Sequence, residues 1–226
     1  MSNSFIIDVR EMAEKRTYTK HRRAESEAET RAHIIEATVA LHEEVGPART
    51  TIAAIAERAG VHRPTVYRHF PTVEGLLGAC SGHWVELHPP PDPASWAAVD
   101  DPSERLCRAL DELFAYYEAT EAMTRNVLRD AAVMPELEIY GDQFSEYFAA
   151  VTHVLLAGRA ADSMLEAALT LATAFETWQT MTQRADLERA GAVALAVALV
   201  NGVTRATDAT TPIPRRRDVD GRHDSH

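Results

Sequence analysis

Five polar side chains that can hydrogen-bond to nucleic acid lie between positions 63 and 69 of this chain. They belong to Arg63, Thr65, Tyr67, Arg68 and His69. A guanidinium can donate two parallel hydrogen bonds to guanine, a threonine methyl can contact thymine, and a hydroxyl can hold a phosphate. Such contacts need a short helix whose opposite side packs against a hydrophobic core. Val66 and Phe70 have the spacing to turn inward and to pack in that core.

The residues before this segment predict the element that positions it. Apolar side chains at helical spacing indicate a short helix over positions 52–59, with Thr51 placed to cap its N-terminus. Gly60 ends this helix because glycine accepts the left-handed backbone of a helix C-terminus. Pro64 suits the first turn of the next helix. Two short helices joined by a glycine turn indicate a helix-turn-helix, a unit that binds DNA.

The segment that contains these two helices resembles a known protein family. Residues 30–77, about a fifth of the chain, resemble the N-terminal domain of the TetR family of bacterial regulators. The residues that fall in register are Thr50-Thr51, Ile55-Ala56, Ala59-Gly60-Val61 and the run from Pro64 to Phe70. The resemblance implies that Arg63, Thr65, Tyr67 and His69 face the major groove or its flanking phosphates. It also implies that Thr50 and Thr51 contact the DNA backbone. The alternative for Tyr67 and His69 is that they only pack or are solvated.

Two departures from the family pattern remove phosphate contacts. The family often has a lysine at the start of its fourth helix and charged residues after the paired threonines, whereas this chain has Val73, Ala53 and Ala54. A basic N-terminal arm, residues 1–23, can supply replacements by following the DNA backbone or entering the minor groove. Its basic side chains are those of Lys15, Arg16, Lys20, His21, Arg22 and Arg23. The alternative is that these charges are simply solvated.

Charge is divided unevenly along the chain. Residues 1–71 have a net charge of +1 and the remainder −12, for a total of −11. An acidic body repels phosphate, so DNA binding must depend on a local basic face and on specific contacts. Glu25, Glu27 and Glu29 are expected in the first turns of the first helix, where they complement its dipole.

The remaining sequence predicts an all-α fold. The fold class is a three-helix DNA-binding domain with a helix-turn-helix, followed by a helical domain. The family resemblance implies that this second domain binds a ligand and dimerises. The first helix ends at Gly46-Pro47, and the fourth is capped by Thr72. Further helices are expected over 102–119, 120–133, 136–157, 162–183 and 187–203. The predicted divisions are an arm (1–23), the DNA-binding domain (24–71), the helical domain (72–207) and a disordered tail (208–226).

The last two predicted helices are apolar on more than one side. The helix over 162–183 has two adjacent apolar faces, and the segment 192–200 is apolar all round. The family resemblance implies a homodimer in which these helices form a four-helix bundle with those of a second subunit. Its expected interface residues are Leu165, Leu169, Ala172, Leu195 and Leu199. The alternative is that they form only the core of one chain. Two copies would read the half-sites of a palindromic operator in double-stranded DNA.

The resemblance also implies a repressor that is released by a small-molecule effector. Binding of the effector in the helical domain of each subunit would tilt the fourth helix and change the distance between the two DNA-binding domains. Candidate ligand-binding residues are Phe114, Tyr117, Met123, Asn126, Met134, Phe144, Phe148, Phe175 and Trp178. Asn126, Arg129 and Glu176 are the polar anchors if they point inward. The alternative is that the aromatic and methionine side chains are ordinary core.

Other function classes find little support. The chain contains no GxSxG, P-loop or HExxH motif, so we expect neither an enzyme nor a cofactor. Cys80, His83 and His88 are not shown to converge as metal ligands. The lack of a long apolar run or a signal-peptide pattern predicts a cytoplasmic protein without membrane contact. The competing hypothesis is that the chain is a helical ligand-binding or protein-interaction module whose DNA-binding domain binds DNA only weakly.

Overall fold

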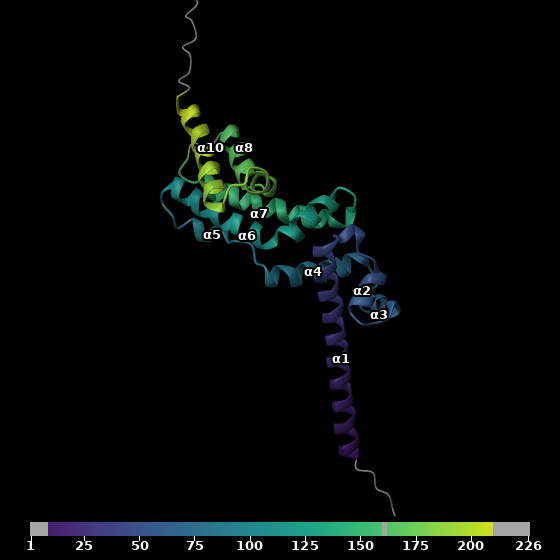
Figure 1. The fold of residues 1–226 in the computed structure, drawn as a ribbon. Helices are drawn as coiled ribbons and strands as arrows, with labels where there is room; N and C mark the ends of the chain where they lie inside the picture. The colour runs from purple at the N-terminus through teal and green to yellow at the C-terminus, as the bar shows by residue number, and fades with distance from the viewer. Residues whose placement is uncertain (1–8, 160–161, 210–226) are drawn as a thin grey trace, which may run out of the picture. The chain divides into compact units, whose positions relative to one another are not determined.

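The computed structural model describes residues 9–159 and 162–209, and within these ranges it contains helices and turns but no strand (Figure 1). The predicted all-α fold class is therefore confirmed. No helix in the described part of the chain is both long and apolar enough to cross a membrane. Most of the predicted tail, residues 210–226, lies outside the described residues.

The first helix, α1 (Val9–Glu44), is longer than predicted and contains most of the basic segment. The structure thus corrects the expectation of an arm that precedes the helix. The physical reason is that no glycine or proline occurs between Val9 and Glu44. Side-chain contacts one turn apart, His21 with Glu25 and the ion pair of Arg23 with Glu27, also support a helix. Glu25, Glu27 and Glu29 were expected in the first turns of this helix, where they would complement its dipole. They lie in the middle of α1 instead, so that expectation is wrong.

The helix-turn-helix forms as predicted. A 3-10 turn, η1 (Pro47–Arg49), leads from α1 to α2 (Ile52–Arg58), and α3 (Arg63–His69) follows. The Thr51 hydroxyl caps α2 by accepting a hydrogen bond from the N–H of Ala54 at 3.2 Å. Gly60 has a φ of +67°, the left-handed conformation that the turn requires.

The two motif helices pack against each other and α2 packs on α1, around one apolar cluster. Its members include Ile34, Leu41, Ile55, Val66, Phe70, Leu76, Cys80 and Met123. Val66 is fully buried and Phe70 is 5% exposed. The back of α3 is therefore fixed, as the spacing of these two residues predicted.

Helix α4 (Val73–Leu87) starts at the predicted cap, where the Thr72 hydroxyl accepts a hydrogen bond from the N–H of Gly75 at 3.1 Å. It packs against α1 and buries Cys80. Burial raises the pKa of the Cys80 thiol to about 12. Residues 88–92 are not helical, as the prolines there predicted, and a one-turn helix, α5 (Pro93–Trp96), follows.

A single helix, α6 (Pro102–Ala131), replaces the two that were predicted over 102–119 and 120–133. Thr120 does not cap a second helix, because its hydroxyl donates to the carbonyl of Tyr116 one turn earlier at 2.7 Å. No glycine or proline interrupts residues 103–131. Cys107 lies exposed near the start of α6. After a 3-10 turn, η2 (Pro135–Leu137), helix α7 (Glu138–Leu156) agrees with the helix predicted over 136–157.

The helix predicted over 162–183 is broken into three pieces. Helix α8 (Ser163–Thr173) ends at Ala174, whose backbone is extended, and α9 (Phe175–Gln179) and a π-helical turn, η3 (Thr180–Arg184), follow. No proline or glycine marks this break, so packing rather than a local signal causes it. The last helix, α10 (Arg189–Ala209), packs against α8.

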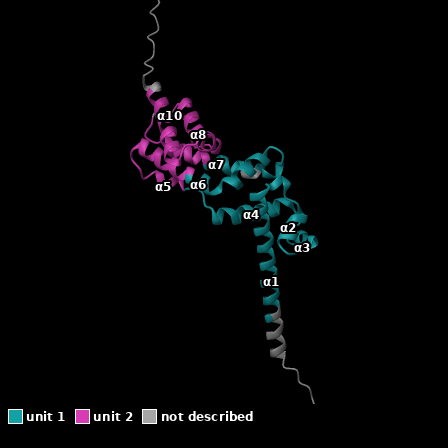
Figure 2. Ribbon diagram, viewed as in Figure 1, with its two compact units in different colours: residues 1–91, 115–147 teal, residues 92–114, 148–226 magenta. Residues whose placement is uncertain are grey.

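The chain forms two compact units (Figure 2). Unit 1 comprises residues 1–91 and 115–147, and unit 2 comprises residues 92–114 and 148–226. These units do not coincide with the domain boundary predicted at residues 71 and 72. Unit 1 also contains α4 and the second half of α6, whose Met123 belongs to the same apolar cluster as the motif helices.

Candidate DNA-binding site

The outer face of α3 carries three exposed polar side chains. Arg63 and Arg68 are exposed, Tyr67 is 57% exposed, and Thr65 between them is half-buried. Because Val66 on the opposite side is fully buried, the helix presents these side chains in a fixed direction. Two guanidiniums and a phenol on one short helix can donate hydrogen bonds to base edges and phosphates.

His69 differs from the other predicted DNA contacts. It is half-buried, and its Nε2 is buried without a hydrogen-bond partner among the described residues. Nearby, the Arg31 guanidinium lies over the Phe70 ring, 4.8 Å from its centroid, and helps to fix the end of α3. The geometry therefore favours the alternative for His69, in which its ring packs against the protein.

The paired threonines before α2 have different hydrogen bonds. Thr50 is half-buried, and its hydroxyl donates to the carbonyl of Gly46 at 2.8 Å, which uses its only side-chain proton. Thr51 is exposed, and its hydroxyl acts as an acceptor for the cap of α2. Thr51 is thus better suited than Thr50 to donate a hydrogen bond to a phosphate.

Three basic residues of α1, Lys20, Arg22 and Arg23, are exposed, and Arg23 pairs with Glu27 at 3.2 Å. The Arg22 guanidinium lies 6.0 Å from the centroid of the Tyr18 ring. Because these residues are helical, they can follow a phosphate backbone but cannot enter the minor groove as an extended arm.

Three polar side chains of the last turns of α6 form a group that we call the α6 clamp: Asn126, Arg129 and Asp130. The Asn126 amide donates to the carbonyl oxygens of His42 at 3.0 Å and Glu43 at 2.7 Å. The Arg129 guanidinium donates to the carbonyl of Val45 at 2.9 Å. Carbonyl groups at the end of a helix lack partners within it, so the α6 clamp satisfies the end of α1.

Asp130 completes the α6 clamp. Its carboxylate is buried and accepts hydrogen bonds from the N–H of Ala48 at 3.0 Å and from Arg129 at 2.7 Å. Burial alone would raise the pKa of Asp130, but these hydrogen bonds lower it overall. His42 is buried beside it, and burial lowers the pKa of this imidazole to about 4 despite the attraction of Asp130. We conclude that His42 is neutral at pH 7.

Sequence reasoning missed this group. Asn126 and Arg129 were predicted as effector anchors, but their donors bind the end of α1 instead. The available signal was the spacing of residues 126, 129 and 130, which puts three polar side chains on one face of α6. Nothing in the sequence told which helix would lie opposite that face.

Comparison with known proteins identifies the first part of unit 1. Residues 34–80 match the family model described as bacterial regulatory proteins, tetR family. These residues are therefore a DNA-binding domain of the TetR type. The HTH-type transcriptional repressor KstR of Mycolicibacterium smegmatis is 31% identical over 131 residues, which cover 56% of this chain and 64% of KstR. The HTH-type transcriptional regulator TtgR of Pseudomonas putida is 47% identical over 68 residues, 30% of this chain and 32% of TtgR. The chain thus matches less than two thirds of the length of either relative.

Solved structures resemble the fold of most of the chain. A TetR-like transcriptional regulator from a Rhodococcus species has a TM-score of 0.57 and 18% identity, covering 80% of this chain and 96% of that one. A TetR regulator from Haloarcula marismortui has a TM-score of 0.53 and 20% identity, covering 79% and 98%. At these identities the likeness concerns the fold alone.

The predicted effector residues are divided between the two units. Tyr117, Met123, Asn126, Met134 and Phe144 belong to unit 1, and Phe114, Phe148, Phe175 and Trp178 belong to unit 2. Met123 lies in the core beneath the helix-turn-helix, and Phe144 is 43% exposed. In unit 2 the rings of Phe175 and Trp178 are buried with their centroids 5.2 Å apart.

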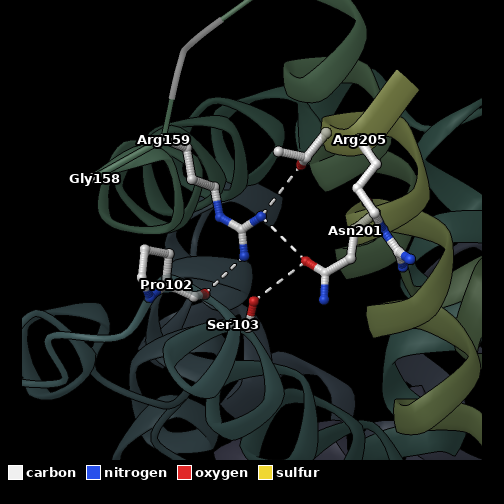
Figure 3. A pocket seen from close by; sticks show the side chains of 7 residues that line it. Pro102, Ser103, Gly158, Arg159, Asn201 and Arg205 are labelled. Carbon is white, nitrogen blue, oxygen red and sulfur yellow. Dashed lines mark hydrogen bonds between the residues drawn. The ribbon is translucent and has the colours of Figure 1, made fainter. Parts of the chain in front are cut away.

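A polar pocket of about 470 Å³ lies in unit 2 (Figure 3). It is lined by Pro102, Ser103, Gly158, Arg159, Asn201, Thr204 and Arg205. The Arg159 guanidinium donates to the carbonyl of Pro102 at 2.8 Å, to Asn201 at 3.3 Å and to Thr204 at 3.4 Å. These contacts tie the start of α6 to α10. None of the predicted effector residues lines this pocket.

The predicted dimer residues occupy two different faces. Leu165, Leu169 and Ala172 of α8 are buried within the single chain, so their prediction as interface residues is corrected. The inner face of α8 is apolar enough to pack on α10 of the same chain. Leu195 and Leu199 of α10 are 42% and 58% exposed. Met164 and Leu171 of α8 are also exposed, by 59% and 65%. The second apolar face predicted for this region is therefore present.

Proposed function

We propose that this chain is a transcriptional repressor that binds a palindromic operator as a homodimer in the bacterial cytoplasm. The observation that carries the proposal is the outer face of α3, where Arg63, Tyr67 and Arg68 are exposed while Val66 and Phe70 are buried behind them. A helix whose inner side packs in the core and whose outer side bears hydrogen-bond donors is suited to the major groove. The match to the tetR family model over residues 34–80 supports the same function.

Each basic or hydroxyl group has a proposed role. Arg63 and Arg68 donate to guanine or to phosphates, Tyr67 donates to a phosphate, and Thr65 contacts a thymine methyl. The Thr51 hydroxyl holds a backbone phosphate beside α2. His69 and Thr50 support the site through packing and hydrogen bonding within the protein.

The basic face of α1 adds contacts that do not depend on sequence. Lys20, Arg22 and Arg23 lie along the phosphate backbone from a helix. These local charges attract DNA, although the chain as a whole has a net charge of −11.

A second copy of the chain covers the outer face of α8 and α10. The supporting observation is that four large apolar side chains of these two helices are exposed: Met164, Leu171, Leu195 and Leu199. Two α8–α10 pairs related by a two-fold axis would form a four-helix bundle. The two copies of α3 would then read half-sites about 34–36 Å apart or at a multiple of that distance.

A small molecule bound in the body of each subunit relieves repression. The aromatic side chains of unit 2 support an apolar binding site: Phe114, Phe148, Phe175 and Trp178. Tyr117, Met134 and Phe144 of unit 1 stay candidates for the same role. The effector and the operator are coupled because each binds one arrangement of the dimer better than the other.

Fluorescence anisotropy tests the proposal with palindromes from the DNA that flanks the gene. Wild-type protein should select one palindrome, with an affinity that falls steeply as salt rises. Arg63→Ala should weaken that binding about tenfold or more, because removing a base contact costs about 1–3 kcal/mol. Arg184→Ala, an exposed arginine of η3, is the matched control and should bind like wild type. Equal affinity of wild type for every sequence would contradict the proposal.

A further inference from the structure

We propose that the α6 clamp sets operator affinity directly, by fixing the segment that joins α1 to α2. This inference rests on the proposed function and adds residues that do not contact DNA. Asn126, Arg129 and Asp130 are positioning residues in this proposal. They act through residues 46–50, which lead straight to the cap of the helix-turn-helix.

The α6 clamp makes several hydrogen bonds to one short stretch of chain. Between His42 and Ala48, the α6 clamp binds three carbonyl oxygens and one N–H, at distances from 2.7 to 3.0 Å. Within the clamp, Arg129 also donates to Asn126 at 3.0 Å and to Asp130 at 2.7 Å. Each member holds the next, so displacing one would leave buried polar groups without partners.

Gly46 lies very close to the side chains of the α6 clamp. This residue has a φ of +93°, and a Cβ added to it would collide with the side chains of Arg129 and Asp130. The backbone of the connection therefore lies directly against the α6 clamp. Gly46 in turn accepts a hydrogen bond from the Thr50 hydroxyl at 2.8 Å, one residue before the Thr51 cap of α2. A continuous chain of contacts leads from α6 to the start of the motif.

The second half of α6 is held by the core of unit 1. Met123 and Val127, on the turns that carry the α6 clamp, pack in the apolar cluster that also contains Ile55 of α2 and Val66 of α3. The α6 clamp and the two motif helices therefore rest on one shared core. The clamp can thus hold the connection before α2 in a fixed position relative to α2 and α3.

The test compares Arg129→Met with Arg125→Met in the full chain. Arg125 lies one turn earlier on α6 and forms an exposed ion pair with Glu121, so it is a matched control. Arg129→Met should weaken binding to the selected palindrome about tenfold, within the roughly 5–150-fold range typical of coupling between sites. Arg125→Met should bind like wild type. Arg129→Lys keeps a charged donor near Asp130 and Val45 and should restore part of the affinity.

A second control separates positioning from stability. Val127→Ala removes apolar contacts of α6 but leaves the α6 clamp intact. At a temperature where all variants are folded, the proposal requires Val127→Ala to keep its DNA affinity and Arg129→Met to lose it. If both lose affinity in proportion to their melting temperatures, the clamp is only structural and the proposal is overturned.

Hydrogen exchange makes the test independent of operator binding. Amides of residues 46–58 should exchange faster in Arg129→Met than in wild type or Arg125→Met. Unchanged exchange in this segment would overturn the proposal about the clamp. Failure of wild type to select any palindrome, with the exchange difference present, would instead count against the proposed function.

Discussion

The helices of units 1 and 2 are held in different ways. In unit 1, α2 and α3 have seven residues each, too short to be stable alone, and they depend on a cap, a glycine turn and one shared core. In unit 2, α8 and α10 pack on each other and still expose four large apolar side chains. The motif is therefore complete within one chain, whereas the surface of α8 and α10 is suited to a further partner.

The largest expected effect separates the two faces of α8 and α10. Leu169→Glu buries an unpaired charge in unit 2, at a cost on the order of 3–5 kcal/mol, and should unfold that unit. Leu199→Glu changes a side chain that is 58% exposed, and should give a folded monomer. Thermal melts and analytical ultracentrifugation measure the two outcomes. A folded dimer of Leu199→Glu would show that this face is not the interface.

Acid should weaken unit 1 through His42. The unfolded chain binds a proton at this residue near its ordinary pKa of 6.5, but the folded chain does so only at about 4. Stability present at pH 7 is thus lost as the pH falls, by about 2 kcal/mol at pH 5. Urea unfolding at pH 7 and pH 5 measures this loss. His42→Gln should show a smaller difference between the two pH values, and an equal difference would rule out this residue as the cause.

Loss of a helix cap should have a smaller effect, confined to unit 1. Thr51→Ala removes the acceptor for the N–H of Ala54 and should cost about 1 kcal/mol of stability. Thr51→Ser keeps the hydroxyl and should retain most of it. The melting temperature of each variant measures the effect. If the two substitutions lower it equally, the cap does not stabilise α2.

The smallest expected effect concerns the basic face of α1. Replacing Lys20 and Arg22 by alanine should weaken binding to all DNA sequences alike and reduce the salt slope by about 1 for each phosphate that is no longer neutralised. Selectivity for the palindrome should not change. Anisotropy titrations at several salt concentrations provide the slope. An unchanged slope would mean that these charges are only solvated.

The same difference between the units explains what could be predicted from the sequence. Thr51, Gly60 and Thr72 are local signals that start or end a helix, and each acts as predicted. Val66 and Phe70 are buried because a seven-residue helix with one apolar side offers no alternative orientation. The all-α fold and the outer face of α3 follow from such local chemistry.

The features that could not be predicted depend on packing between distant segments. Ala174 breaks a helix without any residue that disfavours one, and Thr120 continues a helix that it was expected to start. Leu169 and Leu199 are both leucines on apolar helices, and only the fold decides which of them is buried. Asn126 likewise has no local signal for its distant partner, the end of α1.

The two cysteines have a practical consequence. Cys80 is buried with a pKa raised to about 12, so it stays a protonated thiol at neutral pH, whereas Cys107 is exposed near the start of α6. A maleimide dye should therefore label one position in each chain without any engineered cysteine. The unmodified protein thus has its own attachment point for a fluorophore or spin label, on the helix that ends in the α6 clamp.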